Sequence, residues 1–320
     1  MKIVITGALG HIGSRLIRDL PTAFEKAEIV LLDNLSSQRY CSLFNLPPRN
    51  HYRFIEADVL DTDLNDIFRD AEVVIHLAAI TNAAGSFEIK DHVETVNYVG
   101  TQKVAKACAT TGSALLFLST TSVYGTQMET VDEHCPVSDL KPQSPYAESK
   151  LKAEQYLQKL GAEEGLRFIV CRFGTIFGAS IGMRFHTAIN KFCWQAINGL
   201  PITVWRTALD QKRPYLHLTD AINAIQFILD KSLFDNQIYN VLSANASVRQ
   251  ITEIIGRYIP DIDIQFVDTT IMNQLSYNVL NDKFKQQGFN FQGNLKEGIS
   301  ETLELLMGLH CGGKDEIRRI

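Results

Sequence analysis

Short apolar runs and longer stretches with helical spacing alternate through the first half of the chain. The apolar runs are Lys2–Thr6, Ile29–Leu32, Tyr52–Ile55, Glu72–Leu77, Ala114–Leu118 and Arg167–Cys171. The helical stretches are Ile12–Leu20, which stops before Pro21, His92–Thr111, which Gly112 caps, and Pro145–Glu164. Short strands that are apolar throughout and alternate with helices are typical of a parallel sheet covered on both faces. The pattern predicts an α/β fold with a doubly wound parallel sheet that binds ligands at the carboxyl ends of its strands.

Beyond about Gly178 the alternation becomes irregular. Helical spacing recurs in Arg184–Asn198, Thr219–Asp230 and Leu295–Met307, and Ile262–Val267 is predicted to be a strand. We expect residues 1–178 to form a domain that carries the catalytic residues. Residues 179–320 are expected to form mainly a smaller C-terminal α/β lobe for substrate, with some segments returning to the core.

The composition is that of an ordinary globular protein, with 45% hydrophobic and 21% charged residues. The net charge is -5, so the chain lacks the overall positive charge that would indicate nucleic acid or an anionic membrane surface as a partner. No apolar run approaches the ~20 residues that span a bilayer, and we predict no signal peptide. The cysteines contain no C-x-x-C pair, so we predict no metal site and interpret them as reduced thiols of a cytoplasmic protein. They are Cys41, Cys108, Cys135, Cys171, Cys193 and Cys311.

Three glycines follow the first predicted strand in Thr6-Gly7-Ala8-Leu9-Gly10-His11-Ile12-Gly13. Gly7 permits a tight turn, Gly10 lets the backbone approach a pyrophosphate, and Gly13 lets the helix pack closely on the strand. The helix N-terminus then offers free N–H groups and the positive end of its dipole to the phosphates. An ordinary strand-to-helix turn also accounts for a glycine triplet by itself. Here Asp33 follows about twenty residues later at the end of a strand, and this combination is typical of a dinucleotide site.

Asp33 also selects the cofactor, because its carboxylate accepts hydrogen bonds from a ribose hydroxyl and repels a 2′-phosphate. NAD is therefore predicted rather than NADP, although Arg39 lies nearby in the sequence. Asp58 and Val59, after the third strand, either contact the adenine or merely cap a loop. The residues expected to contact the cofactor in this part of the chain are Gly7, Leu9, Gly10, His11, Ile12, Gly13, Asp33, Asn34, Asp58 and Val59.

Tyr146 and Lys150 form a Y-x-x-x-K motif, whose spacing places both side chains on one helix face. The ordinary pKa of tyrosine, near 10, is too high for a base at neutral pH. A neighbouring ammonium and a nicotinamide cation would both lower this pKa by favouring the phenolate, and the lysine can also hold the nicotinamide ribose. Upstream, Ser119–Ser122 place hydroxyls directly after Ala114–Leu118, where they can hydrogen-bond a reacting oxygen. Each motif alone is common by chance, but their order along an α/β pattern indicates a catalytic site.

With these motifs the chain resembles the extended short-chain dehydrogenase/reductase superfamily, of Rossmann fold, and within it the nucleotide-sugar epimerase/dehydratase family that includes UDP-glucose 4-epimerase. Other segments that carry the resemblance are His76-Leu77-Ala78-Ala79, Val96–Thr101, Arg172–Gly178 and Gln211–Asp220. The resemblance implies a homodimer formed through His92–Thr111 and Pro145–Glu164, catalysis by Thr120, Tyr146 and Lys150, and cofactor contacts from Tyr146 and Lys150. It also implies cofactor contacts from Leu77, Ala78 and Ala79. The implied substrate residues are Thr81, Thr120, Thr121, Thr175 and Arg213, with the guanidinium of Arg213 on the substrate diphosphate.

The residues after Thr120 bear on the reaction. In nucleotide-sugar 4,6-dehydratases of this family, the catalytic threonine is followed by an Asp-Glu pair needed for proton abstraction and loss of water. Thr121 and Ser122 occupy those positions here and do no acid–base work at neutral pH, so a dehydratase is not expected. We predict an NAD-dependent epimerase that oxidises C4 of a nucleotide-sugar to a 4-keto intermediate and returns hydride to its other face.

Two alternatives to the epimerase are open. One is a reductase or dehydrogenase of a keto-sugar nucleotide or another alcohol, which would show net consumption of cofactor. The other is a non-catalytic dinucleotide-binding protein, against which the intact set of Thr120, Tyr146 and Lys150 argues. Thr175 stands where many members of the family carry asparagine, and Asn273–Asn278 lack an arginine that often helps to hold the nucleotide. Both differences leave the nucleotide and the sugar open.

Overall fold

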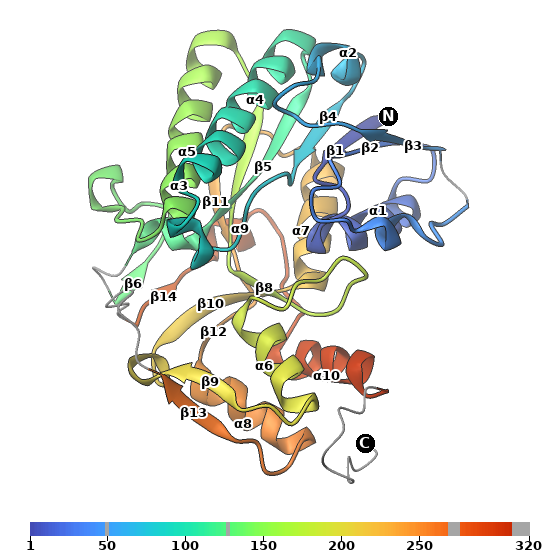
Figure 1. Ribbon diagram of the computed structural model, residues 1–320. Coiled ribbons are helices and arrows are strands. Elements are labelled where there is room, and N and C mark those ends of the chain that lie inside the picture. The colour runs from blue at the N-terminus through green and yellow to red at the C-terminus, as the bar shows by residue number, and fades with distance from the viewer. Residues whose placement is uncertain (49–50, 126–128, 268–275, 309–320) are drawn as a thin grey trace.

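The computed structural model describes residues 1–48, 51–125, 129–267 and 276–308 of the chain. Within these residues, the largest sheet is parallel and seven-stranded, in the order β11-β7-β5-β4-β1-β2-β3. Its strands are β1 (Lys2–Thr6), β2 (Glu28–Asp33), β3 (His51–Glu56), β4 (Val73–His76), β5 (Ala114–Thr120), β7 (Phe168–Phe173) and β11 (Ile238–Val241). The predicted α/β doubly wound sheet is confirmed (Figure 1).

Helices cover both faces of this sheet (Figure 1). On one face lie α1 (His11–Ala23) and α7 (Leu218–Lys231), and on the other lie α2 (Leu64–Phe68), α4 (Gly100–Thr111) and α5 (Pro145–Glu164). Alternate residues of each strand serve the two cores, since side chains along a strand point to opposite faces. Ile3 and Ile5 of β1 belong to the core with α1, whereas Val4 belongs to the core with α4 and α5.

The two helices predicted around the catalytic motif form where the sequence places them. α5 begins after Ser144, whose side chain accepts a hydrogen bond from the backbone of Ala147, and ends at Gly165 with a left-handed φ of 70°. The predicted helix at 92–111 consists of α3 (Lys90–Val93), a π-helical segment (Glu94–Val99) and α4, which Gly112 closes with a φ of 77°.

The prediction that the first helix stops before Pro21 is wrong, because α1 continues to Ala23. Proline has no N–H to donate to the carbonyl four residues earlier, which is Ile17. The Tyr52 hydroxyl, from β3, donates to that carbonyl oxygen at 2.8 Å. A tertiary contact therefore replaces the missing bond of the helix.

The remaining elements lie mainly at the carboxyl ends of the large sheet (Figure 1). Smaller sheets join β8 (Thr175–Phe177), β10 (Lys212–His217) and β12 (Ala244–Ser247), then β9 (Ile202–Trp205) and β13 (Ile264–Val267), and lastly β6 (Thr130–Val131) and β14 (Asn278–Val279). The further helices are α6 (Ala188–Ile197), α8 (Val248–Tyr258), α9 (Asp282–Gln286) and α10 (Leu295–Leu306). Short 3-10 turns occur at Tyr40–Leu43, Gly85–Phe87, Thr121–Tyr124, Val137–Asp139 and Arg206–Ala208.

Several C-terminal predictions change at their boundaries. α6 begins at Ala188 rather than at Arg184, and residues 178–187 form a loop. β11 is part of the large sheet and α7 packs on it. The division into domains at residue 178 stays a prediction. Residues 273–275 of the segment Asn273–Asn278, and Cys311, lie outside the described residues. No helix in the described part of the chain has the length and apolar character needed to cross a membrane.

Candidate active site

A cleft of about 780 Å³ is lined by residues at the carboxyl ends of strands of the large sheet and by residues of β8, β9 and β10. Of the predicted site residues, it is lined by Gly7, Gly10, His11, Ile12, Gly13, Asp33, Asn34, Asp58, Val59, Leu77, Ala78, Ala79, Thr81, Thr120, Thr121, Tyr146, Lys150, Thr175 and Arg213. Leu9 is the exception: its side chain is buried in the core and its backbone N–H donates to Asp33. Residues from both halves of the chain thus meet in one cleft, as the carboxyl-end rule for parallel sheets requires.

The glycine turn after β1 is closely packed at two positions and open at the third. A Cβ atom on Gly7 would lie 2.5 Å from the backbone nitrogen of Ala78, and Gly7 has a φ of 65°. A Cβ on Gly13 would lie 2.4 Å from the carbonyl oxygen of Ala8. A Cβ on Gly10 would meet no described atom closer than 3.4 Å, so protein packing does not require glycine there. Its absence of a side chain instead leaves room for a ligand above the turn.

Asp33 and Asp58 lie beside this turn, at the ends of β2 and β3. The Asp33 carboxylate accepts hydrogen bonds from the backbone N–H groups of Leu9 and Leu35, both at 3.0 Å. Asp58 accepts one from the backbone of Leu60 at 2.8 Å and one from the side chain of Asn34 at 2.7 Å. Asp58 therefore caps its loop and also lines the cleft, so the two sequence interpretations of this residue are compatible.

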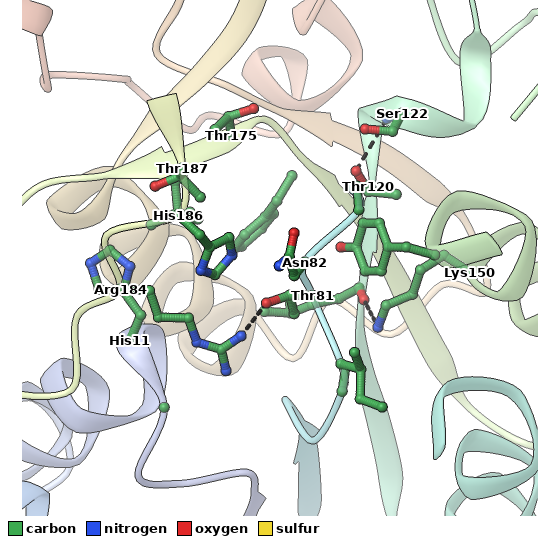
Figure 2. Close-up of a pocket in the computed structure, with 18 of the residues that line it drawn as sticks. His11, Thr81, Asn82, Thr120, Ser122, Lys150, Thr175, Arg184, His186 and Thr187 are labelled. Carbon is green, nitrogen blue, oxygen red and sulfur yellow. Dashed lines mark hydrogen bonds between the residues drawn. The ribbon is translucent and has the colours of Figure 1, made fainter. Parts of the chain in front are cut away.

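Thr120, Tyr146 and Lys150 meet on the other side of the cleft. Thr120, the last residue of β5, forms a side-chain hydrogen bond with Tyr146 of α5 and accepts a bond from the backbone of Ser122 at 3.1 Å. The Lys150 ammonium donates to the carbonyl oxygen of Leu118 at 2.8 Å and lies 4.6 Å from the centre of the Phe117 ring. Figure 2 shows the Thr120 and Lys150 side chains on the same side of the pocket, with the bond between Thr120 and Ser122 dashed.

Burial disfavours the charged forms of both groups of the Y-x-x-x-K motif. It raises the pKa of Tyr146 to about 12, partly offset by the hydrogen bond from Thr120 and by the charge of Arg184. Burial lowers the pKa of Lys150 to about 7, partly offset by Glu154 one turn further along α5. The charge of Arg184 thus favours the phenolate of Tyr146, and the role of the Lys150 ammonium expected from the sequence stays a prediction.

A buried polar network lies between α5 and the strands β5 and β7. Arg172 of β7 pairs with Glu154 of α5, with Nη2 2.6 Å from Oε2, and the two side chains are 3% and 2% exposed. Ser119, next to Thr120, donates its hydroxyl to the same carboxylate. Asn97 is fully buried as well and joins the backbone of Ile80 to Ser149 of α5. These bonds fix α5 against β5, which places Tyr146 opposite Thr120.

The predicted substrate residues differ in what their side chains contact. The Thr121 hydroxyl donates to the carbonyl oxygen of Phe173 at 3.3 Å, and Thr175 reaches the cleft from β8. Arg213 of β10 donates to Gln211 at 3.0 Å and to the carbonyl oxygen of Lys212 at 2.9 Å, and its guanidinium lies 5.3 Å from the Tyr277 ring. Arg213 therefore lines the cleft with an oriented guanidinium, on the strand where the family resemblance places the diphosphate contact.

Sequence reasoning missed Arg184 and His186, which also line the cleft. Arg184 donates to the Thr81 hydroxyl, as the dashed line in Figure 2 shows. Both residues lie inside the helix predicted at Arg184–Asn198, so the sequence pattern did not indicate that they belong to the site. The signal that was present is local composition: the segment 178–187 contains glycines at 178 and 182 and two serine or threonine residues, which favour a loop.

Comparison with known proteins finds a family model, curated relatives and solved structures that all belong to nucleotide-sugar epimerases and dehydratases. The model of the NAD dependent epimerase/dehydratase family matches residues 3–241. A trifunctional UDP-glucose 4,6-dehydratase/UDP-4-keto-6-deoxy-D-glucose 3,5-epimerase/UDP-4-keto-L-rhamnose-reductase of Arabidopsis thaliana is 30% identical over 95% of this chain. The chain spans 47% of the length of that relative.

Two solved structures have the same fold over nearly their whole length. UDP-glucuronic acid 4-epimerase from Bacillus cereus, solved with UDP-glucuronic acid and NAD, matches with a TM-score of 0.86 at 24% identity, covering 97% of this chain and 100% of that one. UDP-glucose 4-epimerase from Thermus thermophilus, solved with NAD, matches with a TM-score of 0.83 at 25% identity, covering 96% and 99%.

Proposed function

Because this chain belongs to the NAD dependent epimerase/dehydratase family, we propose that it is a nucleotide-sugar epimerase that acts at C4 of the sugar. The observation that carries the proposal is the distribution of acids in the cleft. Among the described residues that line it, the carboxylates are Asp33 and Asp58, at the ends of β2 and β3. Thr120 ends β5, which β4 and β1 separate from β2. Among the described residues, the reacting end thus has a phenol and hydroxyls but no carboxylate to remove water from a sugar.

NAD is the cofactor of this family, and the residues of the cleft fit it. The open space at Gly10 admits a pyrophosphate, and α1 begins there with no side-chain cap on its free N–H groups among the described residues. Asp33 is placed to accept hydrogen bonds from the adenosine ribose, and Lys150 to donate one to the nicotinamide ribose. The nicotinamide would then lie beside Tyr146 and Thr120.

The chain's own side chains account for proton transfer at C4. Bound NAD would supply a reversible acceptor for the hydride at C4 of the sugar. Tyr146 accepts the proton of the C4 hydroxyl during oxidation and gives it back during reduction, so atoms and electrons balance over the cycle. Thr120 donates a hydrogen bond to the same sugar oxygen and holds it near the Tyr146 hydroxyl. Epimerisation then requires the 4-keto sugar to turn in the cleft between the two steps.

The other end of the cleft supports a nucleoside diphosphate as the carrier of the sugar. Arg213 presents a planar guanidinium, which suits paired phosphate oxygens. Lys191 also lines this part of the cleft, and Trp205 and Tyr277 provide aromatic surface for a base. A charged clamp of this kind holds the nucleotide while leaving the sugar free to rotate.

The first test is product analysis with UDP-glucose, UDP-glucuronic acid and dTDP-glucose in D₂O. We expect one of them to give a product of unchanged mass, with no net formation of NADH and no deuterium bound to carbon, because hydride returns directly from the cofactor. Mass loss of one water, with deuterium incorporation, would instead establish a dehydratase. Net change in NADH in proportion to product would establish a dehydrogenase or reductase. Either result would overturn the epimerase proposal.

We also propose that the protein is a cytoplasmic homodimer that pairs through residues 92–111, which comprise the end of α3, the π-helical segment and α4, and through α5. Tyr98 and Tyr156 meet edge to face there, with ring centres 6.4 Å apart, and the buried Tyr156 hydroxyl has no hydrogen-bond partner within the described part of the chain. The cysteines of the described residues are unpaired thiols, which fits a reducing compartment.

Light scattering of the purified protein tests the dimer. We expect about twice the chain mass of 35.9 kDa, and a smaller particle for Tyr156→Glu, because an unpaired carboxylate is costly to bury between subunits. A wild-type mass equal to that of one chain would contradict the proposal.

A further inference from the structure

The loop at residues 178–187, between β8 and α6, is attached directly to the first turn of α1. The Ser14 hydroxyl oxygen accepts a hydrogen bond from the backbone N–H of Gly182 at 2.9 Å, and Ser180 donates to the carbonyl oxygen of His11 at 2.9 Å. The His11 ring donates through Nε2 to the carbonyl oxygen of Gly178 at 2.8 Å. A Cβ on Gly182 would lie only 2.5 Å from the carbonyl oxygen of Leu9. The loop therefore lies in close contact with the glycine turn.

This attachment brings Arg184 to the open side of that turn. The carbonyl oxygen of Arg184 accepts a bond at 3.0 Å from the side chain of Asn190, which is fully buried in α6. At the other end of the side chain, Nη1 donates to Thr81, and Nη2 lies 3.8 Å from the position that a Cβ on Gly10 would occupy. Figure 2 shows the Arg184 side chain extending toward Thr81 across the pocket from Lys150.

The Arg184 guanidinium lies within reach of both Thr81 and the space above Gly10. It interacts electrostatically with Asp33, on the adenosine side, and with Tyr146, on the nicotinamide side. The part of a dinucleotide midway between these ends is its pyrophosphate. The Nε atom of Arg184 is buried and has no hydrogen-bond partner among the described residues. A buried guanidinium donor without an acceptor is costly, so an acceptor is expected in the cleft.

We propose that Arg184 binds the pyrophosphate of NAD and holds the cofactor between the glycine turn and the loop at residues 178–187. The guanidinium fork complements the free N–H groups at the start of α1, and the two bind the same dianion from opposite sides. Through this contact, the bound cofactor links the loop at residues 178–187 to the glycine turn. Such a clamp serves an enzyme that must retain its cofactor between oxidation and reduction, but it does not depend on which reaction follows.

The test measures cofactor binding without turnover. NAD content per chain is determined after purification and denaturation, and NAD and ADP-ribose are titrated into cofactor-stripped protein by calorimetry. For Arg184→Met we expect about 10- to 100-fold weaker binding of both ligands, the range typical of a lost hydrogen bond to a charged group. Equal losses for the two ligands are expected because ADP-ribose retains the pyrophosphate and lacks only the nicotinamide. Arg184→Lys, which keeps the charge but not the fork, should give an intermediate loss.

Two controls separate this role from a structural one and from substrate binding. The melting temperature of stripped Arg184→Met should match that of the stripped wild type, because Thr81 is the hydrogen-bond partner of the guanidinium within the described residues. Arg213→Met removes an arginine from the opposite end of the same cleft and should leave NAD binding unchanged. Wild-type affinity for NAD in Arg184→Met would overturn the proposal, as would a loss confined to NAD with ADP-ribose unaffected.

Discussion

Tyr146→Phe is expected to lower kcat by about a thousandfold or more while the protein still binds NAD. General acid–base groups typically contribute roughly 10²–10⁴-fold in rate, and phenylalanine can neither accept nor return the proton of the sugar hydroxyl. NAD binding should persist because Gly7, Gly10 and Asp33 lie at other strands of the sheet. The measurements are the turnover of the accepted nucleotide-sugar and the NAD content of the purified variant.

A matched control removes a hydroxyl from another partly buried tyrosine. Tyr52 donates to the carbonyl oxygen of Ile17, on the face of the sheet covered by α1, and does not belong to the cleft residues. Tyr52→Phe should lose some stability and keep full activity. Turnover at the wild-type rate in Tyr146→Phe would remove Tyr146 from the mechanism.

The pH profile gives a second signature of the same residue. Burial raises the pKa of Tyr146 to about 12, so the neutral phenol predominates at pH 7 and the active phenolate is the minor form. Activity should therefore increase with pH until the pKa of Tyr146 in the cofactor-bound enzyme is reached, and a bound nicotinamide cation should move that point to lower pH. Any residual activity of Tyr146→Phe should not follow this rise.

Arg172→Met is expected to destabilise the protein by about 3–5 kcal/mol, the usual cost of leaving one member of a buried ion pair uncompensated. Arg172 donates to both carboxylate oxygens of Glu154, at 3.0 Å through Nε and 2.6 Å through Nη2, and both side chains are buried. Without the guanidinium, the Glu154 carboxylate keeps the Ser119 hydroxyl as a partner but loses its counter-charge. Chemical denaturation of the variant and the wild type under the same conditions measures the difference.

The double variant Arg172→Met with Glu154→Gln separates the buried charge from the loss of packing. The Glu154→Gln side chain is neutral and can still accept the bond from Ser119, so most of the lost stability should return. Arg249→Met serves as the surface control, because the pair of Arg249 with Asp210 is solvent-exposed and its loss should leave the unfolding midpoint unchanged. A single variant at position 172 that is as stable as this control would contradict the interpretation.

The sequence pattern correctly predicted the helices and strands whose ends depend on interactions between neighbouring residues. α5 was predicted from Pro145 to Glu164 and forms over that range, because Ser144 caps its start and Gly165 adopts the left-handed conformation at its end. β1 also forms where its apolar run lies, and the strand–glycine–helix order with Asp33 was enough to predict an NAD site. In each case the decisive interaction joins residues that are close along the chain.

Contacts between distant residues decided where other elements begin and end. α1 passes through Pro21 because Tyr52 supplies the bond that proline cannot make. The predicted helix at Arg184 starts instead at Ala188, because hydrogen bonds to Ser14 and to the carbonyl oxygen of His11 hold the preceding loop against the first turn of α1. The residue spacing within α1 or within residues 178–187 does not indicate these distant contacts.

The sequence by itself thus determined the doubly wound sheet, the glycine turn and the residue types of the catalytic motif. Only the tertiary structure decided that Arg184 joins the site and that Arg172 and Glu154 form its buried support. The reason is physical: capping, turn conformation and amphipathic spacing are properties of neighbouring residues, whereas burial and charge pairing depend on which distant side chains the fold brings within a few ångströms.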